Sequence, residues 1–529
     1  MKSVPKQRVS QVFPLGAPTG GIDDTSSIAG MDPSYALEVS NFYVEAGALA
    51  VRWGYQEHVT GMTDNGKTLM VFNAQDGSSE LFCCTDDGIF DITSSTDTPT
   101  NVHALTDGTV VWTQFSNIAG QWLIGCNGVD AAFIYDGTTW TSMSNTGAPA
   151  NPGEITTGGI AVADIVYVHV HKNRIWFIEK NTMSAWYWPL NAVSGATTEF
   201  PLGGIFSKAG YLNSMFSWTM DSGVGVDDIL VFQSSRGELG GYEGIDPSSA
   251  SDWQLLARYF IGAPLGRKTA IPLNGDILLL TEFGIVSLFN VINGTYRLGS
   301  IDSVISAKIS RTLNELVRSR GGAPGWEMIS SPAFQYVVLS IPEFVGFAPY
   351  QFVMNSITKA WSTFDLPAIT IYEYGNNLYF TDDGGRVLKY GAVTADNVLL
   401  DGSGGDPITS GFSQAFTYFE QESVSKHFKF IRTIFESVSN PSFMLTVATD
   451  FKSGGLALLG QPGVSTSTIS QWDSGIWDTA VWSPPLTAWQ TLVGVGDVGY
   501  SASLILKTRT TIETRYVAAH WVFETGTSL

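Results

Sequence analysis

A strand–turn–strand unit recurs along most of this chain and constrains its fold more than any other feature. In each copy, a β-branched or aromatic run meets a glycine-, asparagine- or acid-rich turn and a second apolar run follows, as in a β-hairpin. The copies lie at residues 81–92, 122–135, 174–188, 229–237, 277–284, 336–354 and 378–390. Their spacing of roughly 40–60 residues is typical of radial repeats such as propeller blades. We therefore expect an all-β chain with a β-propeller of six to eight blades; a large sandwich with irregular hairpins is the alternative.

Two further segments repeat the order of strand, polar turn and tryptophan. They are Phe133–Trp140 and Phe352–Trp361. In a propeller, a tryptophan that opens the next strand packs between blades and fixes their spacing. We expect Trp140 and Trp361 to take that position.

The composition favours a protein that works in an assembly. Charged residues make up 15% of the 529 residues, against about 25% in an average soluble domain. Such a surface suggests cover by neighbouring subunits. The net charge is −21, with 49 acidic and 28 basic residues, whereas nucleic-acid binding needs Lys and Arg to displace counterions from phosphates. Acidity would repel DNA from a channel wall, or it simply keeps the protein soluble.

Changes of pattern divide the chain into three parts. We expect an N-terminal platform segment at 1–60, a propeller at 61–400 and, after the glycine-rich stretch 402–407, a β-rich platform or interface module at 411–529. In the last module four tryptophans crowd one region, and a buried core position is favoured over an exposed interface. They are Trp472, Trp477, Trp482 and Trp489.

One segment, residues 301–320, predicts a helix. Its apolar residues form a single stripe at helical spacing. They are Ile301, Val304, Ile305, Ile309, Leu313, Leu316 and Val317. Gly321 and Gly322 would end this helix. A helix that covers one end of the core is favoured over one that contacts another subunit.

The candidates for chemistry are weak, and we predict no enzyme, no catalytic or cofactor-binding residue, no metal ligand and no cofactor. His169 and His171 share a strand face but have no Cys or carboxylate nearby in sequence to complete a metal site. Residues 221–228 resemble a loose calcium loop, yet lack its alternate ligands and distal Glu, so a turn is favoured. Residues 136–140 resemble the Asp-box turn of propeller glycosidases with one residue too few.

The cysteines and the N-terminus bear on the compartment. Cys83 and Cys84 are adjacent, so on a strand they point to opposite faces and do not readily bridge each other. With Cys126 as the third cysteine, no disulfide framework exists, which fits folding in a reducing cytoplasm. Residues 1–8 lack an apolar stretch and no run approaches 18 apolar residues, so we expect neither a standard secretion signal nor a membrane-spanning segment.

The N-terminal stretch carries a resemblance to a known family. Its blocks are followed by others in a fixed order along the chain. They are residues 17–24, 31–43, 48–58, 173–187, 225–228, 244–251, 261–267 and 351–361. Together they resemble the tail nozzle proteins of podoviruses, short-tailed bacteriophages, also called tail tubular protein B. Locally, Asp32–Pro33 predicts a cap and a short helix at 33–40, and Val51, Trp53 and Tyr55 share one face of the next strand.

The resemblance implies a structural subunit of the virion tail, made in the host cytoplasm. It implies a homo-hexameric tube below the head-to-tail adaptor protein that retains packaged double-stranded DNA, conducts it during ejection and contacts tail fibres or tailspikes. The N-terminal signature and residues 411–529 would form the adaptor-facing platform, and we expect a chain without residues 1–55 to fold but not to join adaptor-bearing heads. The alternative function is a glycan-binding or glycosidase-type propeller of a phage tail.

Overall fold

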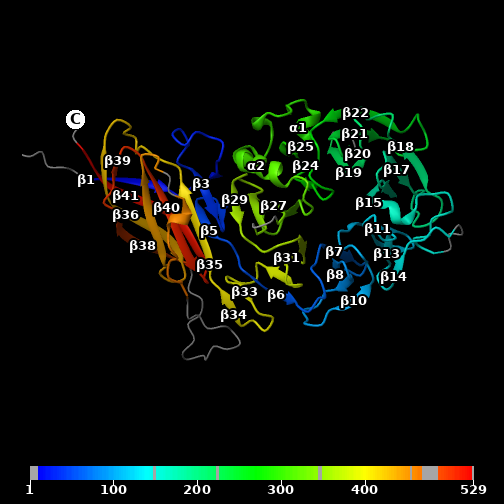
Figure 1. The fold of residues 1–529 in the computed structure, drawn as a ribbon, viewed down its shortest axis with the longest axis horizontal. Coiled ribbons are helices and arrows are strands. Elements are labelled where there is room, and N and C mark those ends of the chain that lie inside the picture. The colour runs from blue at the N-terminus through cyan, green and yellow to red at the C-terminus, as the bar shows by residue number, and fades with distance from the viewer. Residues whose placement is uncertain are drawn as a thin grey trace, which may run out of the picture.

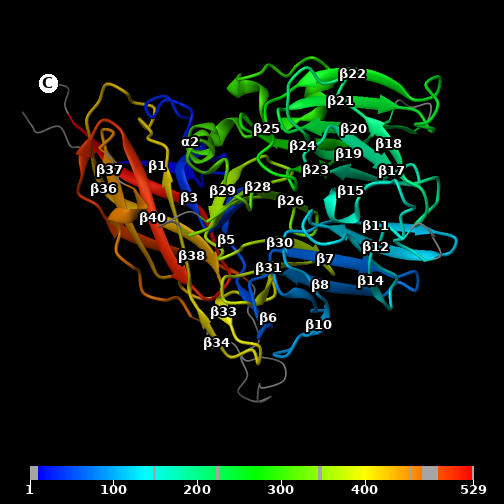
Figure 2. The ribbon, with the colours of Figure 1, turned by 45° about the vertical axis from the view of Figure 1, so that its right-hand side comes forward.

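The computed structural model of the chain describes residues 10–146, 151–221, 226–343, 348–452, 455–466 and 486–526. It has two parts that lie side by side, a ring of small sheets and a platform of two packed sheets (Figures 1 and 2). The chain is all-β, with two short α-helices, α1 (Leu288–Ile292) and α2 (Ser310–Arg320), in its described part. The sequence prediction of a propeller with an additional β-rich module is confirmed.

Seven antiparallel blades form the ring in the described residues. Blades 1 to 4 have four strands each. Blade 1 consists of β7 (Thr68–Asn73), β8 (Ser79–Thr85), β9 (Gly88–Asp91) and β10 (Thr100–His103), and blade 2 of β11 (Val111–Asn117), β12 (Gly120–Cys126), β13 (Phe133–Tyr135) and β14 (Trp140–Ser142). Blade 3 consists of β15 (Ile165–His171), β16 (Arg174–Glu179), β17 (Ser184–Tyr187) and β18 (Thr198–Pro201), and blade 4 of β19 (Leu212–Asp221), β20 (Val226–Ser234), β21 (Glu238–Glu243) and β22 (Gln254–Phe260). Blades 5 to 7 are β23 (Ala270–Leu273), β24 (Asp276–Thr281) and β25 (Gly284–Ser287); β26 (Glu327–Ser331), β27 (Tyr336–Ile341), β28 (Tyr350–Asn355) and β29 (Trp361–Phe364); β30 (Ile371–Tyr374), β31 (Asn377–Thr381), β32 (Val387–Tyr390) and β6 (Tyr55–Val59).

The predicted hairpins map onto the blades one to one. Five of them contain the second and third strands of a blade, from β8 and β9 in blade 1 to β31 and β32 in blade 7, and the segments 229–237 and 277–284 contain the second strand and the turn that leads to the third. The blade number therefore falls within the expected range. The last blade is completed by β6 from near the N-terminus, which pairs with β32 so that Tyr55 lies opposite Tyr390. The segment 1–60 thus contributes strand β6 to the propeller and strands β1 to β5 to the platform.

Side chains at alternate strand positions point to opposite faces of each blade and fill the spaces between neighbouring blades. Seven hydrophobic clusters in the described chain each join two neighbouring blades, and the one between blades 5 and 6 extends into the platform. Cys83 belongs to the cluster between blades 7 and 1, and Cys84 to the cluster between blades 1 and 2. The prediction that the two thiols face opposite ways is confirmed, and both are buried and free.

The two tryptophans of the repeated pattern have different positions. Trp140 stacks on Tyr135 with ring centroids 4.5 Å apart and meets Phe82 of blade 1 edge-on at 5.0 Å. It therefore packs between blades 1 and 2, as predicted. Trp361 is buried in the cluster that blade 6 shares with the platform. Its place is at the junction of the two parts of the molecule.

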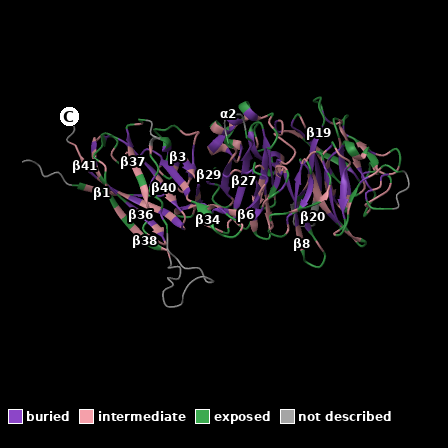
Figure 3. Ribbon diagram, turned by 60° about the horizontal axis from the view of Figure 1, so that its bottom comes forward, coloured by how far each residue is buried: buried purple, intermediate pink, exposed green. Residues whose placement is uncertain are grey.

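The platform interleaves strands from the two ends of the chain. Its outer sheet contains β1 (Ser10–Gly16), β4 (Phe42–Glu45), β5 (Ala48–Val51), β36 (Lys426–Ser437), β38 (Thr487–Gly494), β39 (Val498–Gly499) and β41 (Thr514–Thr525). Its inner sheet contains β2 (Gly21–Ile22), β3 (Tyr35–Ser40), β35 (Ile408–Gln414), β37 (Phe443–Thr449) and β40 (Ala502–Thr510). Between platform and ring, β33 (Asp396–Val398) pairs with β6 and with β34 (Gly404–Asp406). Figure 3 shows buried strands in both parts of the molecule.

The inner sheet is continuous with blade 6. Strand β29 pairs in parallel with β2 and β3, so one sheet of nine strands runs from the propeller into the platform. Its backbone hydrogen bonds, together with the shared hydrophobic cluster, hold the platform to the ring. Removal of residues 1–55 would take β1 to β5 out of these sheets, so the truncated chain that was expected to fold would lack five platform strands.

Two local predictions need correction. The segment 33–40 is strand β3, because Ala36 and Val39 are fully buried and pair with β35, while Asp32 accepts a hydrogen bond from Ser34 N in the preceding turn. The helix predicted from 301 begins at Ser310 and follows two 3-10 turns, Ile301–Ser303 and Ala307–Ile309. Its apolar stripe packs into the core between blade 5, blade 6 and the platform, so the favoured interpretation as a core-covering helix holds.

Candidate interaction surface

The outer sheet of the platform buries one of its faces, and no other described element covers the opposite face. Successive residues of a strand point to opposite faces, so Phe428, Ile431 and Phe435 of β36 lie in the core while Phe430 and Arg432 are exposed. We call the uncovered side the platform outer face. It consists of Val12, Pro14 and Gly16 of β1, Ala518, His520 and Val522 of β41, Phe430, Arg432 and Ile434 of β36, and Gln490, Leu492 and Gly494 of β38.

The strand register sets apolar side chains of this face beside one another. Val12 lies opposite Val522, which lies opposite Phe430 on the next strand. Leu492 lies opposite Arg432, one position along β36 on the same face. Val12 is 63% exposed, Phe430 42% and Leu492 55%. Direct cross-strand neighbours on one face lie about 4.5–5.5 Å apart and diagonal ones about 7–8 Å. Val12, Val522 and Phe430 therefore form an apolar row, and Leu492 lies diagonally from Phe430 beside Arg432.

The charge of the platform outer face differs from that of the whole chain. Its twelve residues include Arg432 and His520, and the carboxylates of the same face stand at its two borders, Glu436 of β36 opposite Ala488 and Glu524 of β41 opposite Ser10, whereas the chain carries a net charge of −21. At one border of the face, Glu524 is paired with Lys429. Contiguous exposed apolar surface with a polar rim marks interaction sites on soluble proteins. This face therefore fits a partner surface that is apolar at its centre and acidic at its edge.

Strand β38 also leaves a sheet edge open. Among the described residues, it pairs with β36 on one side only. Its residues alternate between exposed and half-buried from Ala488 to Gly494. An edge strand offers unpaired backbone N–H and C=O groups to another chain. The open edge adjoins the platform outer face at Leu492.

Two acidic residues of the N-terminal signature hold the platform to the propeller. Asp23 is 1% exposed and accepts a 2.6 Å hydrogen bond from Lys308 Nζ, and Ser26 Oγ donates to it at 2.7 Å. Burial opposes ionisation of Asp23, but the hydrogen bonds from Lys308 and Ser26 outweigh it and lower its pKa below the ordinary value. The neighbouring Asp24 accepts hydrogen bonds from Arg311 N at 3.2 Å and Thr312 N at 2.7 Å. It therefore caps the first turn of α2 from a distant part of the chain.

Arg52 makes the third contact between platform and propeller. The sequence predicted one strand with Val51, Trp53 and Tyr55 on a common face, but the chain leaves β5 at Val51 and enters β6 at Tyr55. Trp53 is 38% exposed at this crossing and Tyr55 is buried. The guanidinium of Arg52 is buried there and binds Asp396 and Asp365.

His169 and His171 lie together, as their spacing predicted. Both imidazoles contact one hydroxyl, with His169 Nε2 at 2.9 Å and His171 Nδ1 at 2.8 Å from Ser217 Oγ. A serine hydroxyl has one proton, so it donates to one ring and accepts from the other. Burial lowers the pKa of His169 to about 4 and that of His171 to about 3. The pair is a neutral hydrogen-bonded contact between blades 3 and 4.

The other sequence candidates are turns or fall outside the described residues. Asp136 accepts hydrogen bonds from Thr138 N and Thr139 N at 2.8 and 2.7 Å, which closes the turn before Trp140. Strands β19 and β20 pair antiparallel on either side of the proposed calcium loop, as a hairpin turn requires, and residues 222–225 are not described. Trp472, Trp477 and Trp482 also lie outside the described residues, and Trp489 is half-buried on β38 and donates to Ser437 O at 3.1 Å.

Two features are absent from the described part of the chain. In that part of the protein, no group of three or more His, Cys, Asp or Glu side chains is placed to hold a metal ion. No helix there is long and apolar enough to cross a membrane.

The arrangement defines the class of protein: a seven-bladed β-propeller joined through a continuous sheet to a two-layered β platform, in the part of the chain that the structure describes. No family model and no curated protein sequence matches this chain.

Several solved propeller-containing structures are similar to it. BBS1N in complex with ARL6DN is 11% identical with a TM-score of 0.39 and covers 64% of this chain and 97% of its own. YCF48 from Cyanidioschyzon merolae is 12% identical with a TM-score of 0.36, over 64% and 98% of the two chains. The Cps50 (Swd1) β-propeller domain of Myceliophteria thermophila is 10% identical with a TM-score of 0.37, over 63% and 99%. At these values the likeness carries no argument about function, and the fold assignment depends on the sheet topology above.

Proposed function

We propose that this chain is a structural subunit of a ring-shaped assembly, and that the assembly is the hexameric tail nozzle of a short-tailed bacteriophage. The observation that carries the proposal is the platform outer face, which is apolar over Val12, Val522 and Phe430, has its carboxylates at its borders and is not covered by the described residues of the single chain. The occupant of this face is the next copy of the same chain. Oligomers of identical subunits close into rings when one surface patch binds a different patch of the neighbour.

Charge supports a second copy as the partner. Arg432 and His520 are the ionisable groups of the face, and the chain as a whole carries 49 acidic residues against 28 basic ones. An arginine beside an apolar patch is complementary to a neighbour that offers a carboxylate. Two copies of the chain supply both halves of such a contact.

The resemblance to podovirus nozzle proteins supports the particular assembly. The residues that carry its N-terminal part, 17–24, 31–43 and 48–58, contribute β2 to β6 and the contacts of Asp23, Asp24 and Arg52. In this proposal the platform also meets the head-to-tail adaptor, and the assembled ring surrounds DNA without gripping it because its walls are acidic. Tail fibres or tailspikes would attach at the outside of the ring.

The test is the size and symmetry of the full-length chain, alone and on adaptor-bearing heads. We expect particles with six-fold symmetry and an axial hole by electron microscopy. The double variant Phe430→Asp/Leu492→Asp should dissociate to monomers by light scattering. Ile118→Asp is the matched control, because Ile118 is fully exposed in a blade 2 turn away from the platform.

Particles of another symmetry would overturn the hexamer, and a monomer that also fails to join adaptor-bearing heads would overturn the assembly role. A monomer or trimer that binds or cleaves glycans would support the phage-tail glycan propeller instead. If Ile118→Asp dissociates the ring as strongly as the double variant, the platform outer face is not the contact.

A further inference from the structure

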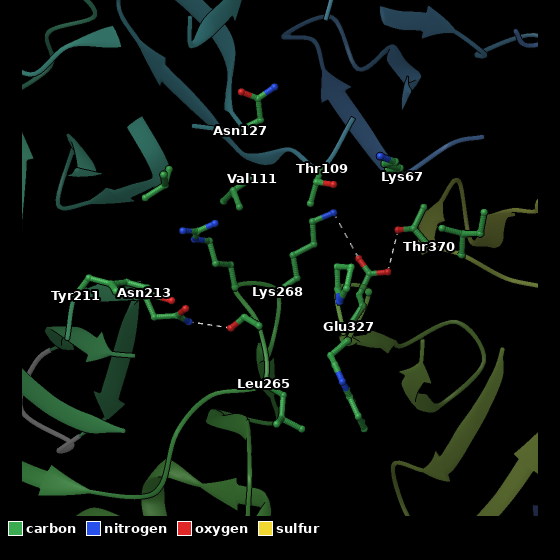
Figure 4. A pocket seen from close by; sticks show the side chains of 17 residues that line it. Lys67, Thr109, Val111, Asn127, Tyr211, Asn213, Leu265, Lys268, Glu327 and Thr370 are labelled. Carbon is green, nitrogen blue, oxygen red and sulfur yellow. Dashed lines mark hydrogen bonds and ion pairs between the residues drawn. The ribbon is translucent and has the colours of Figure 1, made fainter. Parts of the chain in front are cut away.

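The axis of the propeller contains a pocket to which all seven blades of the described chain contribute. Its volume is about 450 Å³. A segment of blade 5, residues 265–268, lines it, and each of the other six blades contributes to its wall. Their wall residues include, from blades 1, 2, 3, 4, 6 and 7 in turn, Lys67, Thr109, Val166, Asn213, Glu327 and Thr370. Figure 4 shows Lys67, Thr109, Asn213, Glu327 and Thr370, from five different blades, around one space. The volume lies within the range of small-molecule sites, roughly 300–1,000 Å³.

Two of the cations at this pocket already have partners. Lys67 Nζ lies 2.6 Å from Asp86 Oδ2. Lys268 Nζ donates to Thr68 Oγ1 at 2.8 Å and lies 3.8 Å from Glu327 Oε1. These contacts fix both ammonium groups at the wall.

The carboxylate of Glu327 already has partners at both of its oxygens. Its Oε2 accepts hydrogen bonds from Thr370 Oγ1 at 2.8 Å and Ile371 N at 3.3 Å. With Lys268 beside Oε1, both carboxylate oxygens have positive or N–H/O–H neighbours. Glu327 is the one carboxylate of the described pocket lining, and it does not form an ion pair with Arg267.

Arg267 is the cation without a partner. Its side chain has no hydrogen bond or ion pair within the described chain, and its Nε is buried with no acceptor. Arg267 also lines a second cavity of about 680 Å³ that adjoins the first and shares Lys268 and Glu327 with it. The backbone of this segment is fixed, because Gly266 O accepts from Asn213 Nδ2 at 2.8 Å and Thr269 Oγ1 at 3.0 Å.

The balance of charge at the pocket is positive. Its described lining contains three cations, Lys67, Arg267 and Lys268, and one carboxylate, Glu327. Asp86 offsets Lys67 from outside the lining, which leaves the charge of Arg267 unopposed. Buried polar and charged groups are normally paired. Arg267 is half-buried, and the buried atom without an acceptor is its Nε. In a protein with a net charge of −21, a guanidinium at the axial pocket that no carboxylate of the described chain pairs is suited to an anionic ligand.

We propose that the axial pocket binds a small oxyanion, the phosphate or carboxylate group of a free small molecule, with Arg267 as its principal donor and Lys268 as its second cation. A guanidinium presents planar N–H groups that match two oxygens of either anion at once, whereas an ammonium acts as a point charge. This proposal does not depend on the function of the assembly, since the pocket lies within one chain.

Calorimetric titration of the full-length protein tests it with three probes at constant ionic strength: inorganic phosphate, glucose 6-phosphate and citrate. We expect saturable binding of at least one probe, and the arms separate phosphate from carboxylate ligands. Arg267→Gln should weaken that binding at least tenfold, and Arg267→Lys should restore part of it. Arg297→Gln removes the same charge from an exposed loop and should leave the affinity unchanged.

Absence of saturable binding by the wild-type protein with all three probes would overturn the proposal, as would equal losses in Arg267→Gln and Arg297→Gln. Circular dichroism checks that the variants fold. If Arg267→Gln does not fold, a crystal structure of the wild-type protein with the bound probe decides the matter. Density beside Arg267 supports the site, and density elsewhere overturns it.

Discussion

Arg52 and Asp396 form a bidentate ion pair between the platform and the propeller. Arg52 directly follows platform strand β5, and Asp396 lies in β33, which follows the propeller strand β32. Arg52 Nη1 and Nη2 each lie 2.7 Å from one oxygen of the Asp396 carboxylate. Nη2 also lies 2.9 Å from Asp365, and Nε donates to Asn41 Oδ1 at 2.9 Å. The Arg52 side chain is 2% exposed and that of Asp396 15%. One guanidinium therefore joins four segments of the chain.

Removal of this guanidinium should destabilise the fold strongly. Arg52→Met leaves Asp396 buried without its partner, and loss of one partner from a buried pair costs about 3–5 kcal/mol. We expect a decrease of that size in the free energy of unfolding, measured with urea. Arg515→Met is the control, because the pairs of Arg515 with Glu45 and Glu513 are about one-third exposed and such pairs contribute about 0–1 kcal/mol. Similar losses in the two variants would contradict a structural role for the buried pair.

Gly21 is a second point at which the platform meets blade 6. Its φ is +75°, and a Cβ there would lie 2.5 Å from Trp361 O and 2.6 Å from Trp361 N. Gly21→Ala should therefore force β2 and β29 apart and lower the unfolding free energy by more than about 1 kcal/mol. Gly47→Ala separates the two causes, because Gly47 has a φ of +87° but nothing within 4 Å of a Cβ. Gly21→Ala should cost clearly more; equal costs would show that backbone strain alone is responsible.

Local patterns predicted the propeller because each blade is built around a hairpin. Both strands of a hairpin and its turn lie within about 20 residues, so composition and alternation identify them. The closing strand β6 escaped prediction, because it pairs with β32 more than 300 residues away. The segment 33–40 was predicted as a helix from its Asp-Pro start, but burial of Ala36 and Val39 in a long-range sheet overrides that local signal.

The candidate surfaces depend still more on long-range register. The apolar patch of the platform outer face exists because β1 and β41, from opposite ends of the chain, place Val12 beside Val522. Alternation in residues 426–437 is a signal for an exposed Phe430, but nothing local identifies its neighbours. Likewise Arg267 stands in one of the blocks that carry the family resemblance, yet its isolation from carboxylates appears only when seven blades meet at the axis.

The cap that Asp24 provides should contribute measurably to stability. Asp24→Ala leaves two backbone N–H groups at the start of α2 without acceptors, and loss of an N-cap side chain costs about 0.5–2 kcal/mol. We expect a decrease in this range in the unfolding free energy. Asp24→Asn should lie between the wild type and Asp24→Ala, because Arg311 N and Thr312 N bond to different oxygens of Asp24 and the single amide oxygen of asparagine can accept from only one of them. Asp302→Ala, at an exposed acidic residue of the 3-10 turn Ile301–Ser303, is the control and should have little effect. A loss in Asp302→Ala as large as in Asp24→Ala would contradict the cap.

The buried histidine pair should make the fold sensitive to mild acid. In the folded protein burial lowers the pKa of His169 to about 4 and that of His171 to about 3, whereas an unfolded histidine titrates near about 6.5. Between those values the unfolded chain binds more protons than the folded one, so stability falls as pH decreases, by roughly 1.4 kcal/mol per pH unit for each proton.

Urea unfolding of the wild type and of His169→Gln/His171→Gln from pH 7.5 to 4 tests this dependence. Glutamine keeps a polar group near Ser217 but does not titrate, so the variant should lose less stability over the interval, even if it is less stable at pH 7.5. The carboxylate of Asp23 has a lowered pKa, so its contribution begins to fall below about pH 5, but this loss is common to both proteins and cancels in the comparison. Parallel curves for the two proteins would show that the histidines are protonated, or solvated, in the folded state and would contradict the neutral pair described here.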